Sequence, residues 1–173
     1  MYKREEKVNY KKWIFTMLSI FWLSIIFSFS LQPAKESGET SMEFGKMLVK
    51  LIVPEFSDEL DDMSDVQLEQ WDHVLRKCAH FMEYLVLGVL VLATLCQMQV
   101  RHRGLVAIGL CSVAAAVDEG IQLFVPGRAG RISDILLDSL GAFTGILVGY
   151  LFMKLYIKIA RDIFCKNTVD KGK

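Results

Sequence analysis

Apolar residues gather in four long runs along the chain, and most of the charged residues lie between these runs. Each run holds 19 to 24 residues with at most two acidic side chains. A transmembrane helix needs about 20 predominantly apolar residues to cross roughly 30 Å of hydrocarbon. The runs therefore predict four transmembrane helices, at residues 13–31, 78–98, 104–126 and 135–153.

The composition favours an integral membrane protein over a soluble domain. Apolar residues make up 53% of the 173-residue chain and the mean hydropathy is +0.34, which is high for a water-soluble surface. The formal net charge is zero, so no basic excess indicates nucleic-acid binding. The first run is too long for the apolar core of a signal peptide, and no A-x-A-like cleavage site follows it. We therefore expect this run to be retained as a span.

Lysine and arginine residues predict the orientation of the spans. They are concentrated in residues 1–12, in the loop 101–103 and in residues 154–173, which four spans place on one side. Short loops rich in these residues stay in the cytoplasm, so both termini are predicted to be cytoplasmic. The chain then divides into a basic tail, a four-helix membrane domain (13–153) with an outer loop at 32–77, and a second basic tail.

The long outer loop contains two predicted helix starts. Thr40 and Glu43 fit a capping box, and apolar residues then recur at helical spacing until Pro54, which predicts an amphipathic helix. This helix could lie in the outer interface of the membrane or cap the bundle. Ser64 and Gln67 form the second start signal, for a helix that continues into the second span.

Ionisable residues interrupt the outer ends of three spans, beginning with the segment RKCAHFMEY at 76–84. A charge at bilayer depth costs roughly 2.5–3.5 kcal/mol on insertion scales, and such residues normally face the interior of a bundle. We therefore predict one polar site that opens toward the outer face. Its members are His80 and Glu83 from the second span, Asp118, Glu119 and Gln122 from the third, and Asp134 and Asp138 from the fourth. Arg76, Lys77, Arg128 and Arg131 could form its rim.

Small residues on the fourth span predict how the helices approach one another. Asp138, Gly141, Gly145 and Gly149 share one helical face. Glycine at every fourth position lets helix backbones pack closely, so this face should lie against a neighbouring span.

The polar segments together resemble the VanZ-like family of membrane proteins, over about residues 13–153. The matching pieces are FSFSLQP (27–33), RKCAHFMEYLVLG (76–88), DEGIQLFVPGR (118–128) and DILLDSLGAFTG (134–145). The resemblance implies a multi-pass protein of the bacterial cell membrane, mostly in Gram-positive bacteria. The family takes its name from a member that lowers susceptibility to teicoplanin, a lipid-tailed glycopeptide antibiotic. One departure is Asp138, where many members have asparagine.

The favoured hypothesis is a recognition site for a component of the cell envelope. Arginine and histidine suit a phosphate or carboxylate, so the expected partners are membrane lipids, a lipid-linked cell-wall precursor or the lipoglycopeptide antibiotic itself. Holding such a component would reduce binding of the antibiotic at the outer face. The candidate ligand-binding residues are Arg76, His80, Glu83, Tyr84, Glu119, Gln122, Arg128, Asp134 and Asp138.

An enzyme is the main alternative, as a hydrolase or transferase acting on a lipid-linked envelope precursor. His80 would be the general base, with Glu83 or Glu119 orienting it. Against this alternative, no serine near the motifs lies in a nucleophile elbow.

A purely structural cluster is the second alternative, held together by the pairs Arg76–Glu83, Arg128–Glu119 and His80–Asp134. The spacing of His80 and Glu83, with Glu119 and Asp134 nearby, would also allow a metal site. A lone histidine among acids in a bundle is more often hydrogen-bonded, so we expect neither a metal nor a cofactor.

Overall fold

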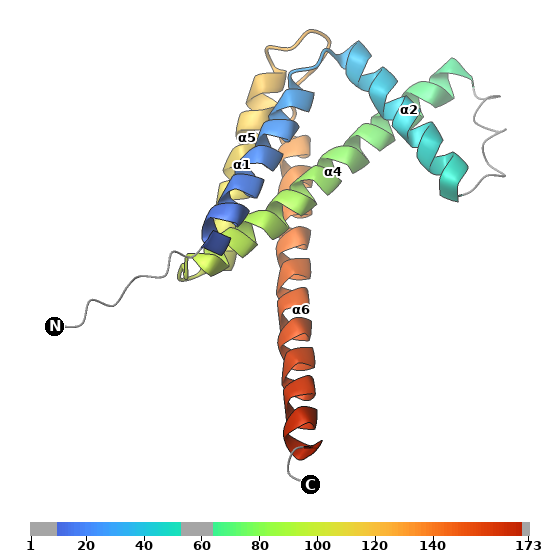
Figure 1. The fold of residues 1–173 in the computed structure, drawn as a ribbon. Helices are drawn as coiled ribbons and strands as arrows, with labels where there is room; N and C mark the ends of the chain where they lie inside the picture. Colours follow the sequence, from blue (N-terminus) through green and yellow to red (C-terminus); the bar gives the residue numbers. More distant parts are fainter. Residues whose placement is uncertain (1–9, 53–63, 171–173) are drawn as a thin grey trace.

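The computed structural model describes residues 10–52 and 64–170, and over these residues it contains helices joined by turns and loops, with no strands. Four helices are long and apolar enough to cross a membrane, which confirms the four predicted spans and the all-α fold. Which end faces the cytoplasm remains a prediction from the basic residues. The helices are α1 (Tyr10–Ser30), α2 (Ala34–Ile52), α4 (Asp65–Gln97), α5 (Arg103–Gln122) and α6 (Ile132–Asp170) (Figure 1).

Helix α2 begins directly after Pro33 and not at Thr40. The Pro33 carbonyl oxygen accepts a hydrogen bond from the Ser37 backbone N–H at 3.0 Å, so proline precedes the first turn. The Thr40 hydroxyl donates to the Glu36 carbonyl oxygen at 3.0 Å, inside the helix. The predicted capping box at Thr40 and Glu43 is therefore wrong, because the chain is already helical there. The helix packs against the first half of α4 (Figure 1).

The second start signal is confirmed, because Ser64 is the N-cap of α4. Its backbone N–H donates to the Gln67 side-chain oxygen at 3.0 Å. The helix then runs without interruption through the segment 76–84 into the second span. Positive φ angles at Gln99 and His102 let the chain reverse within a few residues and enter α5.

Helices α4 and α6 cross at the centre of the bundle, and the predicted glycine face of α6 forms the contact. A Cβ atom on Gly141 would collide with the Phe81 carbonyl oxygen, and one on Gly145 with that of Leu85. From the other side, a Cβ atom on Gly88 of α4 would meet the Ala142 carbonyl oxygen. The two backbones therefore touch, as small residues in membrane helices allow.

Apolar side chains from four helices fill the space around this crossing. The buried core consists of Ile26 from α1, Tyr84 and Leu87 from α4, Cys111 and Ala115 from α5, and Ala142 from α6. With 39 residues, α6 is about 58 Å long, and its C-terminal part extends past the other helices (Figure 1).

Candidate functional site

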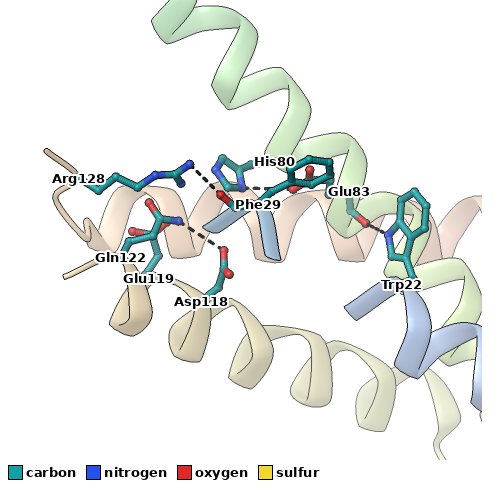
Figure 2. A network of polar contacts seen from close by, with 8 residues as sticks. All are labelled: Trp22, Phe29, His80, Glu83, Asp118, Glu119, Gln122 and Arg128. Carbon is teal, nitrogen blue, oxygen red and sulfur yellow. Dashed lines mark hydrogen bonds and ion pairs between the residues drawn. The ribbon is translucent and has the colours of Figure 1, made fainter. Parts of the chain in front are cut away.

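The polar residues of α4, α5 and α6 meet at the end of the bundle where α1 ends and α6 begins. Figure 2 shows those of α4 and α5, together with Arg128 of the loop. Asp118 and Asp138 are completely buried, and Glu119 is 3% exposed. The structure therefore brings together polar residues from three helices, as the sequence predicted. The Tyr84 side chain is also fully buried among these groups.

Glu119 and Gln122 hold the end of α5 to the loop that follows it. The Arg131 backbone N–H donates to Glu119 Oε2 at 2.9 Å, and Gln122 Nε2 donates to Glu119 Oε1 at 3.1 Å. Gly130 lies so close to the Glu119 carbonyl oxygen that it has no room for a side chain. One carboxylate oxygen therefore fixes the loop between α5 and α6, and the other is held by Gln122 within α5.

The same loop is tied to the end of α1. The Ala34 backbone N–H donates to the Pro126 carbonyl oxygen at 3.3 Å, and Arg128 Nη2 donates to the Phe29 carbonyl oxygen at 3.0 Å (Figure 2). Gly127 has a φ of 76°, a backbone conformation that favours glycine. Burial, together with the nearby positive charge of Arg76, lowers the pKa of the Arg128 guanidinium below its ordinary value.

The ion pairs differ from those that the sequence predicted. Arg76 pairs with Asp72, one turn earlier on α4, and Lys77 Nζ lies 3.4 Å from Asp134 Oδ1. His80 Nδ1 lies 3.5 Å from Glu83 Oε2 on the same helix (Figure 2).

The predicted pairs Arg76–Glu83, Arg128–Glu119 and His80–Asp134 are therefore wrong. Arg128 instead donates to the Phe29 carbonyl oxygen. The Glu119 oxygens already accept from the Arg131 backbone N–H and from Gln122 Nε2.

The start of α6 also differs in detail from the prediction. The helix begins at Ile132, and the backbone N–H of Asp134 already donates to the Arg131 carbonyl oxygen at 3.0 Å. Asp134 therefore lies in the first turn, where a carboxylate meets the positive end of the helix dipole.

A pocket of about 140 Å³ lies between the loop and the first half of α4. Its basic side chains are His73, Arg76, Lys77, Arg128 and Arg131, while His80, Glu119, Gln122 and Asp134 also line it. A cavity of this polarity and size can hold a group larger than one water molecule. The arrangement suits a small anion, with charged donors on several sides.

The candidate residues fall into two groups, one that lines the pocket and a deeper one that does not. Arg76, His80, Glu119, Gln122, Arg128 and Asp134 line the pocket, whereas Glu83, Tyr84 and Asp138 do not. His80 is common to both groups, because its ring also belongs to the deeper one, with Asp118 and Asp138. One donor atom from each of these three residues lies within 4.8 Å of the others, so they could hold a metal ion.

Sequence reasoning did not assign a role to three residues of this region. Asp118 was expected to converge with the other acids but was not included in the candidate binding set. His73 lines the pocket one turn of helix before Lys77, so its spacing could have revealed it. Ser30 is fully buried at the end of α1 beside Asp118, and only the tertiary structure brings them together.

Comparison with protein-family models gives a match to the VanZ/LLP1 family over residues 15–153. Comparisons with curated proteins and with solved structures give no match. The matched range covers most of each of the four apolar spans and every residue of the polar site described above. On this match over most of its length, the chain belongs to the VanZ/LLP1 family of membrane proteins.

Proposed function

We propose that the pocket binds the phosphate or diphosphate group of a lipid-linked envelope precursor at the outer face of the bacterial cell membrane. Occupation of this site lowers the binding of teicoplanin-type lipoglycopeptides, the phenotype that the family resemblance implies. The pocket supports the binding of a phosphate group, and the family resemblance supports the effect on lipoglycopeptides.

Arg128 carries the argument for an anion. Its Nε and Nη1 atoms are buried and have no hydrogen-bond partner among the described residues, while Nη2 is used by the Phe29 carbonyl oxygen. A guanidinium presents its donors in a planar fork that matches two oxygens of a phosphate. Arg76, whose Nε is also unpartnered, lines the same pocket.

The position of the pocket argues for a ligand anchored in the membrane. The pocket lies at the ends of membrane-spanning helices, at the level of the loop between α5 and α6. A lipid phosphate at the membrane surface can enter at this height while its acyl or prenyl chain stays in hydrocarbon. Its charge would also balance the cluster of basic side chains around the pocket.

A binding measurement with a defined probe tests this proposal. The purified chain in nanodiscs would be titrated with a short-chain polyprenyl diphosphate and, as control, with the polyprenyl alcohol of the same length. We expect binding of the diphosphate alone. Loss of a charged hydrogen bond costs about 1.5–3 kcal/mol, so the double variant Arg128→Gln/Arg131→Gln should bind at least about ten-fold more weakly. Arg101→Gln, in the turn at the opposite end of the bundle, is the matched control.

Three other outcomes would contradict the proposal or favour one of its alternatives. Equal binding of alcohol and diphosphate contradicts recognition of phosphate. Equal affinity of the wild type and the double variant shows that the basic residues have a structural role. Release of inorganic phosphate during the incubation supports the alternative of a membrane-embedded hydrolase.

A further inference from the structure

We infer that His80, Asp118 and Asp138 bind one divalent transition-metal ion beneath the pocket. The three residues come from α4, α5 and α6, so the bundle itself assembles the group. One donor atom of each lies within 4.8 Å of the others. Two nitrogen or oxygen ligands of a tetrahedral zinc ion are about 3.4 Å apart, so side-chain rotations that bring the donor atoms roughly 1 Å closer would close the site.

The two carboxylates are buried without the partners that such groups normally require. Asp118 and Asp138 are both 0% exposed. Neither oxygen of Asp138, nor Oδ1 of Asp118, has a hydrogen-bond partner in the described part of the chain. Asp118 Oδ2 receives a long contact from Gln122 Nε2, at 3.5 Å, and the Ser30 hydroxyl also lies beside this carboxylate.

Among the described residues, no lysine or arginine forms an ion pair with either carboxylate, although the charge of Arg128 acts on Asp118. Arg76 and Lys77 form their ion pairs with Asp72 and Asp134, outside the group. Buried charges are normally paired or bind a metal, so two desolvated carboxylates with a neutral histidine match the charge of a divalent cation.

Glu83 lies where the supporting carboxylate of a metal-binding histidine usually lies, although neither of the two facing atoms forms a hydrogen bond in this structure. Its Oε2 lies 3.5 Å from His80 Nδ1, which leaves Nε2 as the ring nitrogen available to a metal. A carboxylate behind a histidine ligand fixes the orientation of the ring and increases the basicity of the donor nitrogen. The Glu83 carbonyl oxygen accepts a hydrogen bond from Trp22 Nε1 at 2.9 Å, which holds this turn of α4 in place.

The donor set indicates the class of ion. One imidazole nitrogen with two carboxylate oxygens suits Zn²⁺, Mn²⁺ or Fe²⁺, whereas Mg²⁺ and Ca²⁺ prefer oxygen ligands alone. The sequence analysis had named Glu119 and Asp134 as possible ligands beside His80 and Glu83, while expecting no metal. In the structure, Glu119 is committed to the loop and Asp134 to Lys77. The inference does not depend on the proposed binding of phosphate.

Metal binding to the purified full-length chain tests the inference. The protein in detergent would be stripped with a chelator, dialysed against Zn²⁺ and analysed for bound metal, and Co²⁺ would be added to a second sample for its visible absorption. We expect about one ion per chain and a higher Tm with Zn²⁺. Wild-type protein that binds no stoichiometric metal in either experiment would overturn the inference.

Variants locate the ion within the bundle. Asp138→Asn keeps the size of the side chain and should abolish stoichiometric binding, as should Asp118→Asn. Glu83→Gln should weaken binding by about 10–100-fold, as for other supporting carboxylates. Asp134→Asn, one turn away on α6, is the matched control and should bind as the wild type does. Equal binding by the Asp138 and Asp134 variants would exclude the proposed ligands, and elution as a single detergent-solubilised species verifies that each variant is folded.

Discussion

Gly145 of α6 lies directly against the backbone of Leu85 in α4, so close that a Cβ atom would collide with the Leu85 carbonyl oxygen. This contact lies at the crossing of the two helices that carry His80 and Asp138. The packing of small residues therefore determines how far apart the two sides of the polar site are.

Substitution of Gly145 by alanine should separate α4 from α6. Because the added methyl group meets backbone atoms that cannot rotate away, we expect a destabilisation of about 1–3 kcal/mol. Gly120→Ala on α5 is the control, since a Cβ atom there meets nothing within 4 Å. Alanine is favoured over glycine inside a helix by roughly 0.5–1 kcal/mol, so the control should be neutral or stabilising. Thermal unfolding in detergent compares the two, and equal Tm values would contradict this packing.

Glu119 should stabilise the conformation of the loop between α5 and α6. In the wild type, each Glu119 oxygen accepts one hydrogen bond, from the Arg131 backbone N–H or from Gln122 Nε2. Glu119→Gln has a single acceptor oxygen, so one of these donors loses its partner, which should lower the stability by about 1–3 kcal/mol. Trypsin cleaves after arginine, so the variant should be cut faster at Arg128 and Arg131. The exposed Glu36→Gln on α2 serves as control. Cleavage at the wild-type rate would show that the loop is held by its other contacts.

The predicted orientation can be tested with single cysteines in a chain whose four cysteines are replaced by alanine. Ala129→Cys lies in the loop beside the pocket, and His102→Cys lies in the turn between α4 and α5. If the basic segments are cytoplasmic, a membrane-impermeant maleimide added to intact cells should label the first position and not the second. Labelling of the second position alone would mean that the orientation is inverted.

Periodicity and charge were sufficient to predict the spans, the glycine face and the convergence of acids. These features follow from patterns within one helix, such as the Gly141 and Gly145 repeat or the shared face of Glu119 and Gln122. The start of α2 was missed because Pro33 begins the helix before the capping pattern at Thr40 is reached.

Contacts between helices were harder to predict than positions on one helix. The pairing of Lys77 with Asp134 and the position of Ser30 beside Asp118 depend on how far each helix is rotated in the bundle. No spacing along the chain contains that information. The sequence placed His80, Asp118 and Asp138 in one polar site, but only the three-dimensional arrangement shows that their donor atoms lie within 4.8 Å of one another.

Binding of fluorescent teicoplanin to susceptible Gram-positive cells is the most direct test of the proposed function. Cells would express the wild type, the Arg128→Gln/Arg131→Gln double variant or Arg101→Gln at matched membrane levels, with fluorescent vancomycin as the comparison antibiotic. The wild type and Arg101→Gln should lower teicoplanin binding, and the double variant should restore it. Teicoplanin binding that is unchanged by wild-type expression, or lowered equally by the double variant, would contradict a role for the basic pocket in this phenotype.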